Sequence, residues 1–184
     1  GISEKQGHLG PLIMSGLGIP DIPATSIESA CCSGGSAFRE AYVNILSGMY
    51  DVMLVIGTEK ISHLDTLTAT TYFSYGGDYL FEGNCGASFP GLYATMARAH
   101  MEQYRTTEED LANIAVKNHI NGLLNDKAHL QKKISVQDVL DSAMVAHPLK
   151  LYDSCPFSDG AAAVVLASDD WIKKNNLNSP VFVK

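Results

Sequence analysis

The chain has 184 residues, 46% of them hydrophobic and 18% charged, with a formal net charge of −7. This composition is too apolar for a disordered segment, and the acidic balance argues against a general nucleic-acid binder, which would carry a basic stripe. No stretch approaches the roughly 18 apolar residues of a membrane span, and the first residues lack the pattern of a secretion signal. Four cysteines without framework spacing indicate reduced thiols and a cytoplasmic location, and without a CxxC pair we expect no metal site.

The first elements predict an α/β layer. Residues 23–30, PATSIESA, are partly β-branched and flanked by turn residues, which predicts a strand. Apolar residues then recur at intervals of three and four over 37–49, which predicts a helix that ends near Ser47 and Gly48. Residues 51–57, DVMLVIG, are a continuous apolar run, typical of a strand buried on both faces. Strand, helix and strand at this spacing predict a right-handed βαβ unit in a parallel sheet.

The next stretch, 64–91, is rich in Thr, Tyr and Gly without a clean period, and we interpret it as a long functional loop. A helical pattern follows at 92–105. Two further helices are predicted by capping boxes, in which the carboxylate three residues after a Ser or Thr reaches back to a free amide. These pairs are Thr107 with Asp110 and Ser135 with Asp138.

The last elements return to the α/β layer. The run AAAVVLAS at 161–168 predicts a second buried strand, 169–176 a short helix, and 180–184 the beginning of a strand. We therefore expect an α/β domain built from 1–66 and 151–184, with an inserted loop domain at 67–150. The chain starts without Met and stops inside an apparent strand, so we expect it to be one piece of a longer protein.

The stretch SIESACCSGGSAF places two thiols, Cys31 and Cys32, at the junction between the first predicted strand and its helix. The free amides and the positive dipole end at a helix N-terminus favour a thiolate there. Residues 33–36 are small, so a substrate carbonyl could approach the sulfur closely. The alternative is that both cysteines are small core residues, since free Cys is among the most buried residue types.

Within this stretch, ESACCSGGSAF resembles the nucleophile motif of the thiolase superfamily, cysteine–any–serine–glycine, and Cys31 aligns with the nucleophile. Three other stretches resemble the sterol-carrier-protein-type and archaeal acetyl-CoA acetyltransferase branch in the same order: 55–62, 106–125 and 147–168. The resemblance covers essentially the whole chain. It implies the N-terminal half of a layered α-β-α-β-α fold with an inserted loop domain, the C-terminal thiolase domain lying outside this chain.

The resemblance also implies a reaction. Cys31 takes an acyl group from acetyl-CoA as a thioester, and a second acetyl-CoA attacks it to give acetoacetyl-CoA; the reverse reaction cleaves a 3-ketoacyl-CoA. No cofactor is implied, because the coenzyme A thioester is the substrate. The family's acid/base and oxyanion-hole motifs belong to its C-terminal half and are missing from this sequence. We do not transfer those roles to Cys85 or His147, which lie in other contexts.

Substrate contacts are implied in the loop domain. Many thiolases carry histidine–methionine–glycine over the acyl pocket, and the matching slot here is Phe89, Pro90 and Gly91; Tyr93, just after it, is a further candidate substrate contact. The acyl-chain preference of those thiolases therefore cannot be copied to this chain.

Four lysines at 115–133 stand against a single acidic residue, which in an acidic protein suggests a face for the phosphates of coenzyme A. Lys117 and Lys127 are the candidates, and the alternative is a solvated loop surface.

Three functions from different classes stay open at this point. The first is a thiolase, the second a non-catalytic relative that binds acyl-CoA or lipid or scaffolds a partner enzyme, and the third a ketoacyl-synthase-type condensing enzyme. The family resemblance implies a homodimer in which the 23–30 strand pairs with its twofold mate, since an open strand edge invites uncontrolled pairing. The loop domain could join dimers into a homotetramer, and an enzyme that uses acetoacetyl-CoA is a possible partner.

Overall fold

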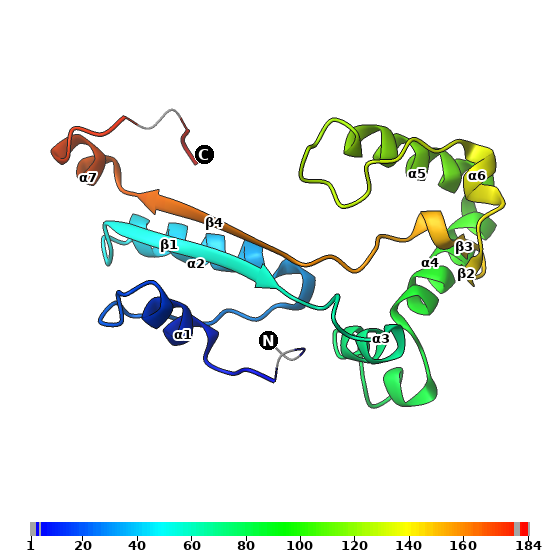
Figure 1. The fold of residues 1–184 in the computed structure, drawn as a ribbon, viewed down its shortest axis with the longest axis horizontal. Coiled ribbons are helices and arrows are strands. Elements are labelled where there is room, and N and C mark those ends of the chain that lie inside the picture. The colour runs from blue at the N-terminus through cyan, green and yellow to red at the C-terminus, as the bar shows by residue number, and fades with distance from the viewer. Residues whose placement is uncertain (1–2, 4, 179–180, 184) are drawn as a thin grey trace. The chain divides into compact units, whose positions relative to one another are not determined.

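The computed structural model in Figure 1 describes residues 3, 5–178 and 181–183, and its chain divides into two units. Unit 1 comprises Gly1–Lys60 and Asp159–Lys184, and unit 2 comprises Ile61–Ser158. The insertion expected at 67–150 lies within unit 2. Helices and strands both occur, and the α/β class predicted from the sequence is confirmed.

Unit 1 is a two-stranded antiparallel sheet with helices around it. Strands β1 and β4 pair from Val52 opposite Ala167 to Glu59 opposite Gly160, and α2 runs along one face of the sheet (Figure 1). Its elements are α1 (Leu9–Gly16), η1 (Ala30–Cys32), α2 (Ser33–Leu46), β1 (Val52–Glu59), β4 (Gly160–Ala167) and α7 (Asp169–Lys174).

The helix predicted at 37–49 is confirmed as α2, and its predicted end is also confirmed. Ser47 is the C-cap, and Gly48 has a φ of 73°, in the left-handed region that Gly adopts at little cost. The short helix predicted at 169–176 is confirmed as α7. Helix α1 was not predicted.

The parallel βαβ unit predicted from 23–30 and 51–57 is wrong. Residues 23–29 form no strand, Ala30 begins η1, and β1 pairs instead with β4, antiparallel and about a hundred residues further along the chain. A strand is defined by the partner that takes its backbone hydrogen bonds, and local β propensity does not identify that partner. Of the strand predicted at 180–184, residues 181–183 form none, and 180 and 184 lie outside the described residues.

The prediction that both strands are buried on two faces is also wrong for this chain. Leu54 and Val165 lie opposite each other in the ladder and are 40% and 63% exposed. On the other face Met53 is half-buried and its partner Leu166 is 8% exposed. One helix covers one face of a sheet, so the apolar side chains of the second face stay in contact with solvent.

Unit 2 is mainly helical, and its core lies between α5 and α6. Ala112, Ala115, Ile134 and Val139 are buried there, and Tyr152 packs against them. The elements are α3 (Thr66–Ser74), η2 (Gly83–Cys85), α4 (Phe89–Tyr104), α5 (Glu108–Gly122), α6 (Val136–Leu140), β2 (Met144–Ala146), β3 (Leu149–Lys150) and η3 (Leu151–Asp153).

Both predicted capping boxes are confirmed. The Asp110 N–H donates to Thr107 Oγ1 at 3.2 Å, and the Thr107 N–H donates to Asp110 Oδ2 at 2.8 Å. Ser135 and Asp138 exchange the same pair of bonds at 3.2 and 2.8 Å. The helix predicted at 92–105 is confirmed as α4, which begins three residues earlier.

The long loop predicted over 64–91 is wrong in part, because it contains α3. Asp65 is the N-cap, accepting a hydrogen bond from the Thr68 N–H at 3.0 Å, and Ala69 is fully buried. A capping side chain and one buried position specify this short helix without a repeating apolar stripe. The β2–β3 hairpin, whose turn holds a cis His147–Pro148 bond, was not predicted.

Candidate functional site

The two adjacent thiols of unit 1 lie on η1, immediately before α2. Cys31 and Cys32 are both exposed, so the alternative that they are buried core residues is wrong. Cys32 is also the N-cap residue of α2. Ala30, directly before Cys31, has a φ of 47°, in the left-handed region that residues with a Cβ rarely adopt. The chain therefore makes a tight turn that presents both sulfurs to solvent.

This turn is held by Ser33, the first residue of α2. Its hydroxyl accepts a hydrogen bond from the Ser29 N–H at 2.8 Å and donates one to the Ala30 carbonyl at 2.7 Å. The Glu28 carboxylate also accepts from the Ala30 N–H, at 2.5 Å. At this junction the Ser29 and Ala30 N–H groups have no strand or helix partner, and these side-chain hydrogen bonds satisfy them.

The thiol with the most polar surroundings is Cys32. Its sulfur lies 3.6 Å from Ser36 Oγ and 3.8 Å from Ser29 Oγ. Hydrogen bonding by Ser36, and then by Ser29, lowers the pKa of the Cys32 thiol. The motif register favours Cys31 as nucleophile and does not identify these contacts. Only Ser36, four residues after Cys32, has a spacing that helical geometry brings together; Ser29 precedes the left-handed Ala30, and no spacing signals its contact.

Beside this turn lies an open groove of about 430 Å³ within unit 1. Ser33 and Gly34 of α2 line it, together with 57–59 at the end of β1 and 160–162 at the start of β4. Most of these residues are Gly, Ala, Ser or Thr, so the backbone of all three elements is within reach of a molecule in the groove. No side chain caps the first amides of α2, and N–H groups in a first helical turn have no partner inside the helix.

The predicted acyl-pocket residues open α4 in unit 2. Ser88 caps this helix by accepting from the Gly91 N–H at 3.3 Å, and Pro90 occupies its first turn, where a missing N–H costs nothing. Phe89 contacts Tyr93 with ring centroids 5.5 Å apart, and Phe73 at 6.2 Å. Phe89 and Pro90 are half-buried, and Tyr93 is 54% exposed.

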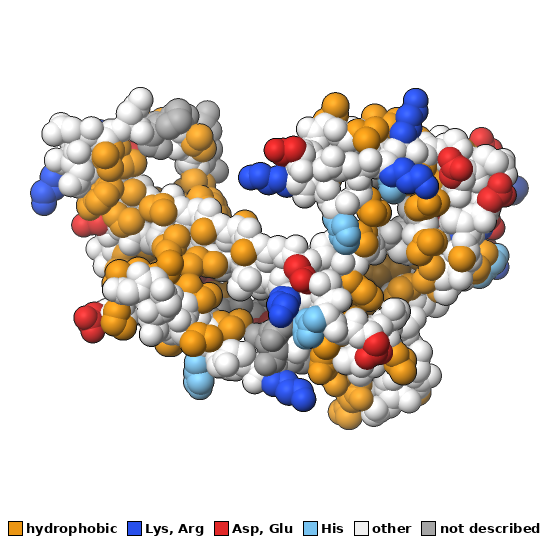
Figure 2. Space-filling model, in the orientation of Figure 1, with side chains coloured by type: hydrophobic (Ala, Val, Ile, Leu, Met, Phe, Trp, Pro, Cys, Tyr) orange, Lys and Arg blue, Asp and Glu red, His pale blue; other side chains and the backbone are white. Residues whose placement is uncertain are grey.

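The predicted basic face follows α5 and the loop after it. Lys117 lies on α5 and Lys127 in the loop, and both are exposed. Figure 2 shows several basic side chains over this part of unit 2. Lys132, in the same loop, differs from them because its ammonium group donates to the Tyr152 hydroxyl at 3.1 Å, which raises the pKa of Lys132.

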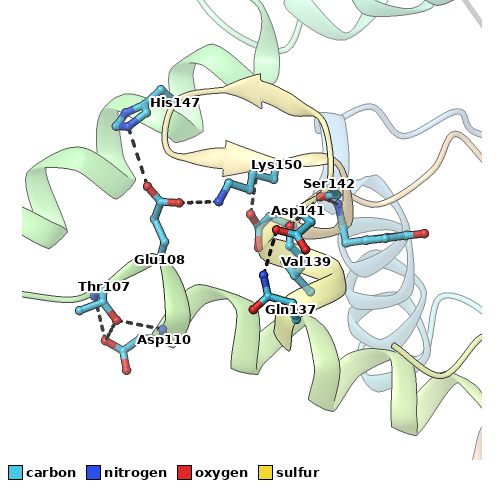
Figure 3. A network of polar contacts seen from close by, with 11 residues as sticks. Thr107, Glu108, Asp110, Gln137, Val139, Asp141, Ser142, His147 and Lys150 are labelled. Carbon is cyan, nitrogen blue, oxygen red and sulfur yellow. Dashed lines mark hydrogen bonds and ion pairs between the residues drawn. The ribbon is translucent and has the colours of Figure 1, made fainter. Parts of the chain in front are cut away.

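A separate polar network anchors the β2–β3 hairpin (Figure 3). Lys150, only 9% exposed, donates from Nζ to the Glu108 carboxylate at 2.6 Å, and this bond lowers the pKa of Glu108. His147 Nε2 lies 3.9 Å from the other Glu108 oxygen. The contact of His147 is thus with a helix-start carboxylate inside unit 2, which favours a structural role.

A family model described as "Thiolase, N-terminal domain" matches residues 12–170. The chain belongs to the thiolase N-terminal domain family. This confirms the family that the cysteine motif and the three further stretches resemble.

Relatives of this thiolase domain include two archaeal proteins named acetyl-CoA acetyltransferase. The one from Methanothermobacter thermautotrophicus is 41% identical over 184 residues, and the one from Methanocaldococcus jannaschii is 38% identical over 185. Each match covers 100% of this chain and 47% of the relative, so the chain spans about half the length of these relatives. Sterol carrier protein 2 of Gallus gallus is 31% identical over 172 residues, covering 90% of this chain and 31% of that protein.

Among solved structures, the thiolase domain is similar to a chain of the Ltp2–ChsH2(DUF35) aldolase. The TM-score is 0.63 at 26% identity, and the match covers 76% of this chain and 37% of that one. The layered thiolase fold class predicted from the sequence is therefore confirmed for this half.

The other two cysteines of the thiolase domain, Cys85 on η2 and Cys155 before β4, are exposed and far along the chain from the Cys31 motif. Nowhere in the described residues do three or more His, Cys, Asp or Glu side chains gather into a group that could hold a metal ion. The helices of the described residues include none with the length and apolar character to cross a membrane.

Proposed function

We propose that the protein containing this thiolase domain is an acyl-CoA acyltransferase that joins two acetyl-CoA molecules, or cleaves a 3-ketoacyl-CoA, through a thioester on Cys31. The observation that carries the proposal is the position of Cys31, exposed on the tight turn that opens α2. The names of the archaeal relatives support the acetyl-CoA chemistry.

In the first half-reaction the Cys31 thiolate attacks the carbonyl carbon of acetyl-CoA. A carbon–sulfur bond to Cys31 forms, the bond to coenzyme A breaks, and the departing thiolate takes a proton. The uncapped amides of Gly34 and Gly35 in the first turn of α2 could donate to the oxygen as it gains negative charge. Gly34 also lines the groove, so its backbone is accessible there.

In the second half-reaction a second acetyl-CoA loses a methyl proton and its carbon attacks the Cys31 thioester. A carbon–carbon bond forms, Cys31 leaves as a thiolate, and acetoacetyl-CoA is released. The base and the donors for this step are not among the motifs of this sequence. We place them in the part of the relatives' length that this chain does not cover.

Unit 2 is proposed to bind the substrate. Lys117 and Lys127 are exposed cations suited to the phosphates of coenzyme A. Phe89, Pro90 and Tyr93 present an aromatic and apolar start of α4 to an acyl chain. No cofactor is required, since the thioester substrate supplies the activated carbonyl.

Assembly is proposed on two grounds. Residues 23–29 belong to neither sheet of the described chain, which leaves them open to pairing with a second copy in a homodimer, and a homotetramer would follow from contacts of unit 2. The printed name of the solved neighbour joins Ltp2 to ChsH2(DUF35), which supports the proposal of a partner protein here as well, such as an enzyme that consumes acetoacetyl-CoA.

A second candidate is a non-catalytic protein that binds acyl-CoA or lipid, and the similarity to sterol carrier protein 2 favours it. One experiment separates the two. The full-length protein is incubated with acetyl-CoA, and the cysteines are mapped by mass spectrometry. We expect an acetyl group on Cys31 alone, and Cys31→Ala to lower thiolysis by roughly 10³-fold or more.

The matched control is Cys85→Ala, which removes another exposed thiol and should leave the activity unchanged. Acetylation of Cys32 with Cys31 unmodified would transfer the nucleophile to the thiol with the lowered pKa. Binding of acetyl-CoA without acylation of any cysteine would support the non-catalytic candidate instead.

A further inference from the structure

The loop after α5, residues 123–134, carries three of the lysines of the basic face but has no helix or strand of its own. Most of its side chains are exposed, and only Ile134 reaches the core of unit 2. Ordering such a loop costs conformational entropy for every backbone and side-chain torsion that becomes fixed. Its conformation therefore depends on the side chains that anchor it.

The first anchor is His119, in the last turn of α5. Its Nδ1 lies 2.9 Å from the carbonyl oxygen of Lys132. A carbonyl only accepts, so Nδ1 carries the proton and donates across thirteen residues of chain. The His119 ring also stands edge-on to Tyr152, with centroids 5.8 Å apart and planes at 85°, a favourable aromatic geometry.

The second anchor is the hydrogen bond between Lys132 and Tyr152, which links His119, Lys132 and Tyr152 into one group of contacts. The Lys132 ammonium donates to the Tyr152 hydroxyl at 3.1 Å, while the Lys132 carbonyl accepts from His119. Tyr152 lies on η3 and packs against the buried core of unit 2. Lys132 thus ties the end of the loop both to α5 and to η3, two residues before Ile134, which is buried in the core.

The middle of the loop is held separately. His129 Nδ1 lies 2.6 Å from Ser158 Oγ, and the Gln131 amide donates to the carbonyls of Asp126 and Ala128 at 2.9 and 3.2 Å. Lys127 lies inside this braced stretch, and its ammonium contacts no carboxylate in the described part of the chain. Lys132 is engaged by Tyr152, which leaves Lys127 and Lys133 as the loop cations available to an anion, and Lys127 is the one inside the braced stretch.

We propose that His119 is a positioning residue that, through Lys132 and Tyr152, holds the loop so that Lys127 meets the phosphate groups of the coenzyme A substrate. This rests on the proposed function. His119 itself does not touch the substrate. By ordering the loop before binding, His119 reduces the conformational entropy that is lost when the substrate binds. Its effect is therefore on the affinity for the nucleotide part of coenzyme A, and not on the chemistry at Cys31.

The test uses the full-length protein and two acetyl thioesters, acetyl-CoA and acetyl-pantetheine, which lacks the nucleotide phosphates. His119→Ala should raise KM for acetyl-CoA about three- to ten-fold, the range of a lost hydrogen bond, and leave kcat unchanged. KM for acetyl-pantetheine should not change. Tyr152→Phe, which keeps the ring but removes the hydroxyl, should act in the same direction.

His119→Asn provides the rescue, because an Asn amide can donate from nearly the same place as Nδ1. It should recover most of the affinity for acetyl-CoA. The matched control is His100→Ala, which removes another hydrogen-bonded exposed His, in α4. This control should leave both KM values at the wild-type level.

Equal rises of KM for the two thioesters, or a loss in kcat alone, would overturn the positioning role. Acylation of Cys31 by acetyl-pantetheine reports separately on the proposed reaction. If the wild-type protein is acylated but shows the same KM for acetyl-CoA and acetyl-pantetheine, the proposed reaction stands and this inference is overturned. A wild-type protein that is not acylated by either thioester overturns the proposed reaction, and calorimetric titration with coenzyme A still decides whether His119→Ala weakens binding.

Discussion

At the scale of single residues, Cys31 and Cys32 differ in two properties: the position in the family motif and the polarity of the surroundings of the sulfur. Cys31 is the nucleophile that the motif resemblance predicts, whereas Cys32 has the two serine hydroxyls near its sulfur. Because the contacts with Ser36 and Ser29 lower the pKa of Cys32, this thiol should react with general alkylating agents at a lower pH than an ordinary thiol.

We therefore predict that Ser36→Ala raises the pKa of Cys32 toward its ordinary value. The Ser36 hydroxyl has the larger effect on this pKa, so its loss lowers the thiolate fraction of Cys32 at neutral pH and slows its alkylation. The measurement is the rate of iodoacetamide labelling of Cys32 from pH 6 to 10, resolved by mass spectrometry, with N-acetylcysteine as reference thiol. A Cys32 profile identical in the wild type and in Ser36→Ala would contradict the role of the hydroxyl.

At the scale of elements, the helices of unit 2 depend on capping more than on apolar periodicity. Helix α5 has a complete capping box and three acidic residues in its first turn, where the helix dipole favours negative charge. The bonds from Thr107 lower the pKa of Asp110, and the bonds from Ser135 do the same for Asp138. A carboxyl whose pKa is lowered by folding stabilises the folded state above its unfolded pKa and loses that contribution as the pH falls.

Thr107→Ala is predicted to destabilise the start of α5 by about 1 kcal/mol at pH 7. The difference from wild type should shrink as the pH falls from about 4 through the lowered pKa of Asp110, because the protonated carboxyl no longer completes the box. Hydrogen exchange of the first α5 amides in the full-length protein measures both effects. Thr95→Ala, an exposed mid-helix Thr in α4, is the control, and equal protection losses at both sites would refute the capping account.

At the scale of the whole molecule, unit 1 leaves one face of its sheet uncovered. Leu54 and Val165 are opposite each other and largely exposed, and such contiguous apolar surface marks a place where another layer or chain packs. The chain also spans about half the length of its archaeal relatives. We connect the two facts by proposing that the remaining half covers this face.

The 184-residue chain by itself is accordingly predicted to show no measurable thiolase turnover, although slow acylation of Cys31 should be detectable. Loss of one oxyanion donor costs roughly 2.7–4 kcal/mol of transition-state stabilisation, and loss of a general base costs about 10²–10⁴ in rate. The assay follows the absorbance of acetoacetyl-CoA during thiolysis, with the full-length protein as control. Activity close to that of the full-length protein would mean that His147, Cys85 or His119 supplies the missing chemistry.

The sequence by itself determined the features that depend on residues close together in the chain. The apolar stripe of α2, the glycine that ends it, the two capping boxes and the family motif around Cys31 each depend on residues within a few positions of one another. Local geometry determines which of these side chains meet, so they could be predicted without the rest of the chain.

Only the tertiary structure decided which strands pair, which apolar faces stay exposed and which side chains surround each candidate residue. The pairing of β1 with β4 joins residues about a hundred positions apart, and the anchoring of Lys132 by His119 and Tyr152 joins three separate segments. Such contacts depend on how the chain closes its loops and on what covers each surface, and no residue spacing specifies either. For that reason the motif predicted Cys31, whereas the contact of Cys32 with Ser29 and the positioning role proposed for His119 emerged only from the fold.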